Sequence, residues 1–221
     1  MIFSHKRQNV LAIGAHPDDV EFGCSGTLIR HSHSGDNVTV LVMTNSASVD
    51  GTTGMTIRTH DQLNKETNEA AERMEADLRF LDFRDLHVPF SFDSVSGIEK
   101  IIKELNVDIM YTHWAGDSNQ DHIATYKASV AAARYVKNVF CYEQIPIPRH
   151  TENEMKPTMY SDITREFEGK LLVAKSHDSQ LKKYAAAGFN VLENLETLAK
   201  FRGIQAGVEY AEAFQVIKTV T

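Results

Sequence analysis

The sequence predicts an α/β fold in which a parallel β-sheet is covered by helices on both faces. Two observations support this fold class. Short apolar runs rich in β-branched residues alternate along the chain with longer segments of helical character, which is the pattern of repeated strand–helix units. Polar segments also follow directly after two of the apolar runs, at the edge where parallel sheets bind their ligands.

The apolar runs are the predicted strands. The first ends at Gly14, and the second is rich in valine, whose branched side chain suits a strand. The predicted strands span residues 9–14, 38–43, 78–81, 107–112, 139–142 and 211–218.

Helix signals lie between these runs. Asp18 can cap a helix N-terminus, and Glu21 follows three residues later, as in a capping box. This helix is expected to end between Arg30 and Ser34, before the stop signal Gly35-Asp36. Further helices are expected over residues 58–76, 98–105, 121–136, 165–175 and 193–201, and substrate-lining loops over residues 45–57 and 144–160.

Length and composition are those of an ordinary globular protein. The 221 residues are enough for one domain with a sizeable core, so a single domain over residues 1–221 is expected. Hydrophobic residues make up 42% and charged residues 24% of the chain. The formal net charge of -7 disfavours a general nucleic-acid role, because phosphate binding needs a basic surface.

Nothing in the sequence predicts insertion into a membrane. No apolar run reaches the length of a membrane span, and no early segment has the pattern of a signal peptide. Cys24 and Cys141 are too few for a disulfide framework or a cysteine-rich zinc site. They fit a reducing compartment, so a cytoplasmic location is expected.

The first chemistry-bearing motif is Ala15-His16-Pro17-Asp18-Asp19-Val20-Glu21, at a predicted strand-to-helix turn. It places an imidazole and two carboxylates within four residues, and the proline restricts the turn. One aspartate can bind a metal while its neighbour remains free as a base. A helix cap beside an exposed histidine is the simpler alternative.

The second motif, residues 113–122, also lies between a predicted strand and a predicted helix. His122 falls in the first turn of that helix and is a candidate third ligand. Three protein ligands plus water are typical of a catalytic zinc site, and Asp121 is placed to orient an imidazole. The alternative is that Asp121 caps the helix and His122 is solvated.

Two weaker signals remain. Arg58 follows a glycine-containing loop and is a candidate for binding a substrate oxygen, although a surface arginine that begins a helix is equally consistent with the pattern. The polar cluster from Lys175 to Gln180 is more typical of a solvated helix end. Dinucleotide-binding and serine-hydrolase fingerprints are missing from the sequence.

The segment Ala15-His-Pro-Asp-Asp-Val-Glu-Phe-Gly-Cys-Ser-Gly-Thr27 closely resembles the signature of the PIG-L/LmbE-like zinc-dependent N-acetyl sugar deacetylases. Asp121-His122 resembles the second motif of that family. The resemblance extends over nearly the whole chain, through Thr44-Asn45, Gly51-Thr52, Arg58, Lys175, His177-Asp-Ser-Gln180, Arg202-Gly-Ile-Gln-Ala-Gly207 and Tyr210-Ala-Glu-Ala-Phe214.

This resemblance implies a Rossmann-like fold and a zinc ion held by His16, Asp19 and His122. It implies that Asp18 is the general base that takes a proton from water. It also implies a small-molecule substrate with an N-acetylglucosamine-type group, and a homo-oligomer such as a trimer or hexamer.

Position 119 departs from the family pattern. Many members have a histidine three residues before the last zinc ligand, thought to stabilise the oxyanion or to protonate the leaving amine, whereas this chain has Asn119. An amide can donate a hydrogen bond but does not act as an acid near neutral pH. The proton then has to come from another group, with Asp18, His113 and His177 as candidates.

The sequence therefore predicts a zinc-dependent hydrolase that removes the acetyl group from an N-acetylated sugar or sugar conjugate. Asp18 is its base, and Arg58 and Asn119 stabilise the oxyanion. Two alternatives stay open: a metal-dependent hydrolase of another bond, such as a carbamoyl or ester, and a binding protein that keeps the metal site with weak catalysis. Asn119 supports the second alternative, and the intact Asp18 argues against it.

Overall fold

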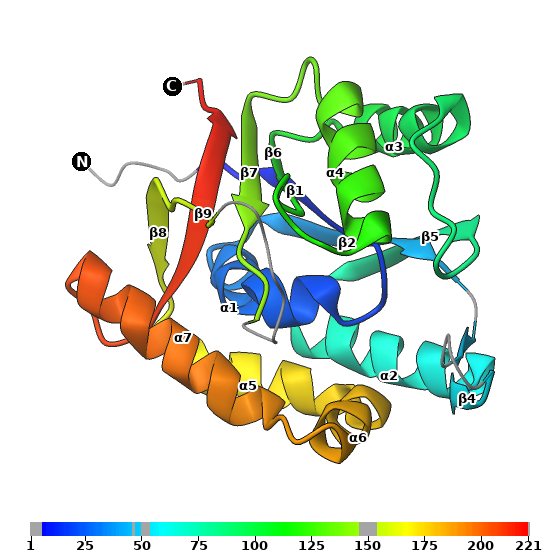
Figure 1. Ribbon diagram of the computed structural model, residues 1–221. Coiled ribbons are helices and arrows are strands. Elements are labelled where there is room, and N and C mark those ends of the chain that lie inside the picture. The colour runs from blue at the N-terminus through cyan, green and yellow to red at the C-terminus, as the bar shows by residue number, and fades with distance from the viewer. Residues whose placement is uncertain (1–5, 46, 50–53, 146–153, 221) are drawn as a thin grey trace.

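A seven-stranded sheet forms the centre of the computed structural model, which describes residues 6–45, 47–49, 54–145 and 154–220 (Figure 1). Its strands, in spatial order, are β5 (Asp77–Phe83), β2 (Asn37–Thr44), β1 (Asn9–Gly14), β6 (Ile109–Thr112), β7 (Asn138–Tyr142), β9 (Ala211–Lys218) and β8 (Met159–Asp162). The first five are parallel, whereas β9 pairs antiparallel with both of its neighbours. The predicted α/β fold is confirmed, with an antiparallel extension at one edge.

Helices cover both faces of this sheet (Figure 1). The helices are α1 (Asp19–His33), α2 (His60–Arg73), α3 (Phe92–Leu105), α4 (Gln120–Ala132), α5 (Phe167–Ser176), α6 (Asp178–Ala186) and α7 (Val191–Ala206). Buried side chains of α1, α2 and α5 share one hydrophobic cluster with the sheet, and those of α3 and α4 share another. A short hairpin of β3 (Ser48–Val49) and β4 (Thr56–Arg58) precedes α2.

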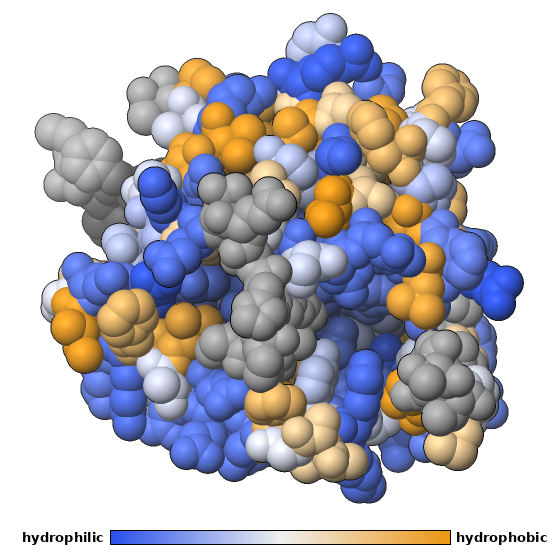
Figure 2. All heavy atoms as spheres, viewed as in Figure 1, coloured by the Kyte–Doolittle hydropathy of each residue, from blue (hydrophilic) through white to orange (hydrophobic). Residues whose placement is uncertain are grey.

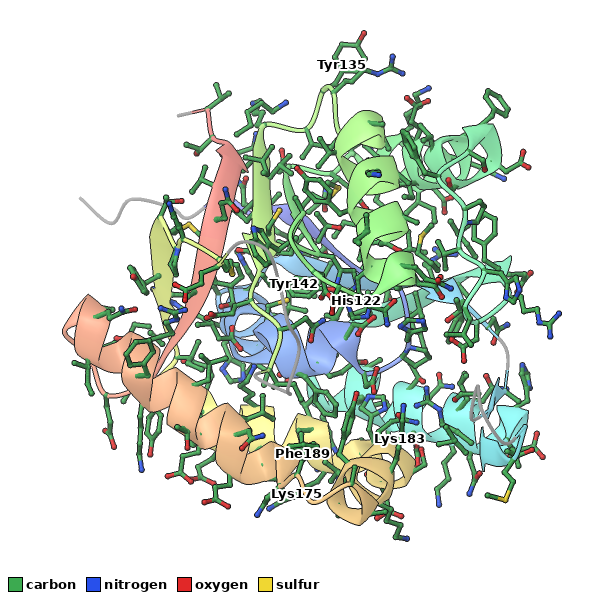
Figure 3. The ribbon with its side chains drawn as sticks, in the orientation of Figure 1. His122, Tyr135, Tyr142, Lys175, Lys183 and Phe189 are labelled. Atoms are coloured by element: carbon green, nitrogen blue, oxygen red, sulfur yellow. The ribbon has the colours of Figure 1, made fainter. Side chains whose placement is uncertain are left out.

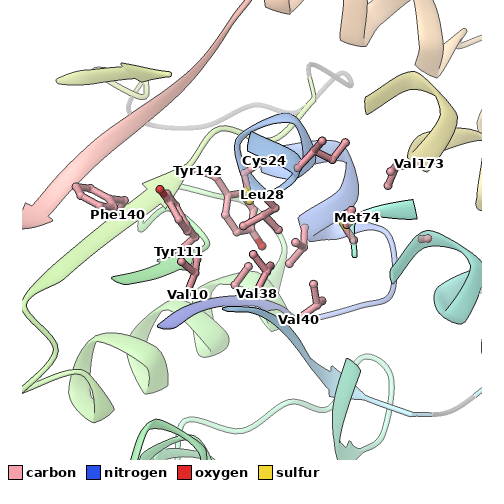
Figure 4. Packing of buried hydrophobic residues seen from close by; sticks show 14 of the residues in the cluster. Val10, Cys24, Leu28, Val38, Val40, Met74, Tyr111, Phe140, Tyr142 and Val173 are labelled. Atoms are coloured by element: carbon pink, nitrogen blue, oxygen red, sulfur yellow. The ribbon is translucent and has the colours of Figure 1, made fainter. Parts of the chain in front are cut away.

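Strand β1 shows how the two cores are separated. Val10 and Ala12 belong to the cluster under α1, whereas Leu11 and Ile13 belong to the cluster under α3 and α4. This alternation follows from the two-residue period of a strand. Figure 4 shows the first cluster, in which side chains of β1 and β2 pack against α1 and against aromatic rings of β6 and β7. Burying each large aliphatic side chain stabilises the fold by about 1.5–3 kcal/mol.

Three details of the predicted secondary structure are wrong. Arg58 ends strand β4 instead of beginning a helix, because Thr59 caps α2 by accepting a hydrogen bond from the Gln62 amide. Helix α3 begins at Phe92, six residues before the predicted start; its first turn exposes Phe92 and buries the polar Ser94, so no apolar period marks it. Strand β8 and helix α6 were not predicted at all.

No helix among the described residues is long and apolar enough to cross a membrane. On the face shown in Figure 2, hydrophobic side chains lie in separate groups among hydrophilic ones. The predicted loops at residues 45–57 and 144–160 fall partly outside the described residues, including Gly51-Thr52 and Pro146.

Candidate metal centre and active site

The two polar motifs meet at one edge of the sheet. Strands β1 and β6 are neighbours and parallel, with Val10 opposite Ile109 and Ala12 opposite Tyr111. The segments that follow the carboxyl ends of β1 and β6 therefore begin side by side. The turn after β1 carries His16, and the segment after β6 leads to His122, which is buried in the first turn of α4 rather than solvated.

The turn between β1 and α1 is strained at Asp18. Its φ of 123° lies where residues other than glycine rarely occur, at a cost of about 1–3 kcal/mol. The Asp18 amide donates to Glu21 Oε2 at 3.2 Å, and the Phe22 amide donates to the Asp18 carbonyl at 2.9 Å. The helix start thus holds both residues 18 and 19 in place, and both are buried.

His16, Asp19 and His122 form a cluster that can hold a metal ion, with one candidate ligand atom from each lying within 4.8 Å of the others. Asp19 lies between the two imidazoles. Its Oδ2 is 3.4 Å from His16 Nδ1, and its Oδ1 is 3.2 Å from His122 Nε2. Two imidazole nitrogens and one carboxylate oxygen are a donor set that zinc accepts.

Each of these histidines is bound to a carboxylate through its other ring nitrogen. His16 Nε2 lies 3.1 Å from Asp121 Oδ2, and His122 Nδ1 lies 2.8 Å from Asp117 Oδ2. In metal sites, such contacts fix the orientation of the ring and the position of its proton. Asp121 therefore contacts His16, although its neighbour in the sequence is His122.

His113 is fully buried and contacts the cluster of His16, Asp19 and His122. Its Nε2 accepts a hydrogen bond from the Ala15 amide at 3.0 Å and is 3.2 Å from Asp19 Oδ2. Its ring stacks on His122 with the ring centroids 4.0 Å apart. Burial, together with the charge of His122, lowers the pKa of His113 to about 4. Through these contacts, the neutral His113 ring supports the turn between β1 and α1.

The charges around the cluster favour a bound cation. Burial acts to lower the pKa of His122, but Asp19 and Asp117 outweigh it and raise that pKa to about 9. Burial also acts to lower the pKa of His16. Contacts with Asp121, Asp19 and Asp85 nevertheless raise that pKa well above its ordinary value. Carboxylates that pull protons onto both imidazoles offer the same attraction to a metal ion.

Asp18 has different surroundings from Asp19. Burial, with the negative charge of Asp19, raises the pKa of Asp18 to about 6, against the opposing charges of Arg58, His177 and His16. Burial also acts to raise the pKa of Asp19, but His122 and His113 hold it well below the ordinary value. Neighbouring carboxylates with separated pKa values are the arrangement expected of one ligand and one base.

A single cavity exposes these groups to ligands. Its walls come from the turn after β1, from the end of β2, from the hairpin of β3 and β4, from the loop after β5, from the N-terminal end of α4 and from α6. Its lining residues are His16, Pro17, Asp18, Asp19, Thr44, Ser48, Ile57, Arg58, Asp85, Leu86, Asn119, His122, Gln180, Lys183 and Tyr184. Figure 3 shows His122 at the start of α4 and Lys183 on α6, which lies across the cavity.

Comparison with known proteins identifies the family. Residues 11–133, more than half of the chain, match the family described as PIG-L: GlcNAc-PI de-N-acetylase. An uncharacterized deacetylase of Escherichia coli K12, YaiS, is 35% identical over 182 residues, which are 80% of this chain and 94% of that protein. The chain belongs to the PIG-L family.

Solved structures agree with the PIG-L fold. The N,N'-diacetylchitobiose deacetylase of Pyrococcus horikoshii has a TM-score of 0.75 at 23% identity and covers 95% of this chain and 84% of its own. GalB, the 4-carboxy-2-hydroxymuconate hydratase of Pseudomonas putida KT2440, has a TM-score of 0.79 at 20% identity, with 97% and 98% covered. The fold itself therefore serves more than one reaction.

Two other residues predicted for the PIG-L site line the same cavity. Arg58 is 3% exposed, and its Nη2 donates to the Pro17 carbonyl at 3.2 Å. Asn119 is the N-cap of α4, since its Oδ1 accepts the Asp121 amide at 2.8 Å and the His122 amide at 3.4 Å. Because the oxygen is used as the cap, the amide NH₂ is the end of Asn119 left to donate to a ligand.

Sequence reasoning missed several residues of this PIG-L site. Asp85 lies 3.1 Å from His16 Nε2 and follows β5, at the same sheet edge as the motifs, which is the signal that could have found it. The cluster from Lys175 to Gln180 is not a solvated helix end, since His177 and Gln180 are buried. Gln180, which belongs to a segment of the family resemblance, lines the cavity.

Proposed function

We propose that the chain is a zinc-dependent deacetylase that hydrolyses the acetamide of an N-acetylated sugar or sugar conjugate of the N-acetylglucosamine type. The observation that carries this proposal is Asp18. It is a buried carboxylate beside the His16, Asp19 and His122 cluster, in the same cavity, with a pKa raised to about 6. Membership of the PIG-L family supports the choice of reaction.

The donor set fits a zinc ion, and the carboxylates around it fit its charge. When bound, zinc would supply Lewis acidity, which activates water and polarises the amide carbonyl. Other divalent metals also accept two imidazoles and a carboxylate, so metal analysis of the purified protein names the ion.

The chain's own residues then perform the proton transfers. Asp18 accepts a proton from the attacking water, because its carboxylate is held at the cavity wall by the strained turn. A pKa of about 6 also allows Asp18 to return that proton to the leaving amine near neutral pH. This route removes the need for an acid at Asn119.

Arg58 and Asn119 stabilise the charge that develops on the acetyl oxygen. The buried guanidinium lines the cavity, and the Asn119 NH₂ is fixed by the cap that its oxygen makes. Donors fixed in this way need no rearrangement during the reaction. Asp121 has an indirect role, since it orients His16.

Acetate release tests this function. A panel of N-acetyl hexosamines, free and nucleotide-linked, together with diacetylchitobiose, is incubated with the purified protein, with and without a metal chelator. We expect acetate from at least one sugar and its loss with the chelator. Release from carbamoyl or ester substrates instead, or from none, contradicts the proposal and favours the alternatives that the sequence left open.

The proposal also includes a cytoplasmic location, supported by free cysteines at the buried positions Cys24 and Cys141. A homo-oligomer, trimer or hexamer, is expected from the family resemblance, and sedimentation in solution tests it.

A further inference from the structure

Arg58 is held by a carboxylate that does not line the cavity. Arg58 Nη1 lies 3.5 Å from Glu66 Oε2, and the two side chains are 3% and 11% exposed. Glu66 belongs to α2, and it contacts the guanidinium without lining the cavity itself. A buried cation needs such a partner, because a buried charge without one is strongly destabilising.

The same carboxylate also binds helix α6. Glu66 Oε1 accepts the Ser179 amide at 2.8 Å, and Glu66 Oε2 accepts the Ser179 hydroxyl at 2.6 Å. Ser179 lies in the first turn of α6, where backbone amides have no partner within the helix. One turn further along, α6 carries Lys183 into the cavity wall opposite His122 (Figure 3).

We propose that Glu66 is a positioning residue that couples the setting of Arg58 to the docking of α6 against the substrate. This inference rests on the proposed deacetylation and deepens it. A substrate that contacts Gln180 or Lys183 fixes α6, and with it the hydrogen bonds from Ser179 to Glu66. Glu66 in turn fixes the guanidinium that donates to the acetyl oxygen. Substrate contacts on α6 thereby set the donor at the end of β4.

The first test separates this role from a merely structural one. Glu66→Gln is made in the wild-type chain and in an Arg58→Ala background, with Glu69→Gln, a partly exposed residue of the same helix, as the matched control. We expect Glu66→Gln to lower kcat by about ten- to a hundredfold in the wild-type chain, the scale of a misplaced group.

In the Arg58→Ala background, the same change should lower kcat less than about twofold, because coupled residues are not additive. Metal content should stay near that of the control, whereas the melting temperature of Glu66→Gln should fall in the wild-type chain, because the buried Arg58 loses its charged partner. An equal loss of kcat in both backgrounds, or no loss in the wild-type chain, overturns the proposal.

The second test needs no substrate, so it distinguishes failure of this proposal from failure of the proposed function. Amide hydrogen exchange is measured on the metal-loaded protein for the first turn of α6. The Ser179 amide should exchange slowly in the wild-type chain and in Glu69→Gln, and faster in Glu66→Ala, which removes both acceptor oxygens. Unchanged exchange in Glu66→Ala overturns the coupling, whether or not any sugar is deacetylated.

Discussion

The two walls of the cavity are built in different ways. On the metal side, His16, Asp18 and Asp19 lie within four consecutive positions, and His122 follows a neighbouring parallel strand. On the opposite side, Arg58 and helix α6 line the cavity and are joined by Glu66 of α2, whose hydrogen bond with Ser179 spans 113 residues of sequence. The first wall depends on local turns, whereas the second depends on tertiary packing.

This difference separates two kinds of function. On the metal wall, the proposed ligands contact adjacent carboxylates and a strained turn, so we expect them to be oriented before a metal binds. The other wall includes α6, whose Ser179 binds the carboxylate of Glu66 through both its amide and its hydroxyl. We therefore expect changes on the first wall to remove chemistry, and changes on the second to tune it.

The largest effect should come from His122. His122→Ala removes one of the three proposed ligands and leaves Asp117 without the ring that it contacts. The wild-type protein should hold about one zinc per chain, and the variant should lose most of it together with activity. His33→Ala, at the far end of α1, should keep both. Full zinc in His122→Ala, measured by elemental analysis, would reject the ligand assignment.

The metal wall was largely predictable from sequence because its residues are close together along the chain or lie at the ends of neighbouring strands. His16, Asp19 and His122 follow from that rule, and the structure brings them together. Asp85 obeys the same rule, but no surrounding motif distinguishes it from the other aspartates near β5.

The other wall was not predictable, since its contacts are long-range. Arg58 was expected either at a helix start or in the site, and only the Thr59 cap and the packing of α2 decide this. Helix α6 has a polar first turn whose burial depends on Glu66 and Glu21, residues more than a hundred positions away. The pattern of polar residues within α6 does not indicate that Glu66 and Glu21 contact it.

The second-largest effect on kcat is expected at Asp18, the proposed base. Asp18→Asn keeps the shape of the side chain and is not expected to release zinc, because Asp18 is outside the ligand cluster. Without a base, kcat should fall by about two to four orders of magnitude. Steady-state rates are measured beside metal content. Unchanged turnover with full zinc would exclude Asp18 as the base.

A smaller effect is expected at Asn119, where two roles can be separated. Asn119→Ala removes both the helix cap and the NH₂ donor, so it should lower stability by about 1 kcal/mol and kcat by about ten- to a thousandfold. Asn119→Asp retains the cap oxygen, loses the donor and adds a negative charge to the cavity lining. Chemical unfolding should therefore show near-wild-type stability for Asn119→Asp, with kcat still reduced. A wild-type kcat in Asn119→Ala would place Asn119 outside the reaction.

The smallest expected effect links the two walls through pH. The base acts when deprotonated, so kcat/KM should fall as pH drops through the pKa of Asp18, which lies at about 6 before a metal is bound. The positive charge of Arg58 lowers that pKa, and removing it should raise the pKa. In Arg58→Met, the acid limb of the profile should therefore move to higher pH, by on the order of one unit.

The bound metal acts on Asp18 in the wild-type chain and in Arg58→Met alike, so the comparison depends on the difference between the two profiles. Arg79→Met, which removes an exposed arginine of β5, is the control for a lost surface charge and should leave the limb in place. An acid limb that moves to lower pH in Arg58→Met, or moves equally in both variants, would show that Arg58 does not act on the base. The walls would then be electrostatically independent, and Arg58 would serve the acetyl oxygen alone.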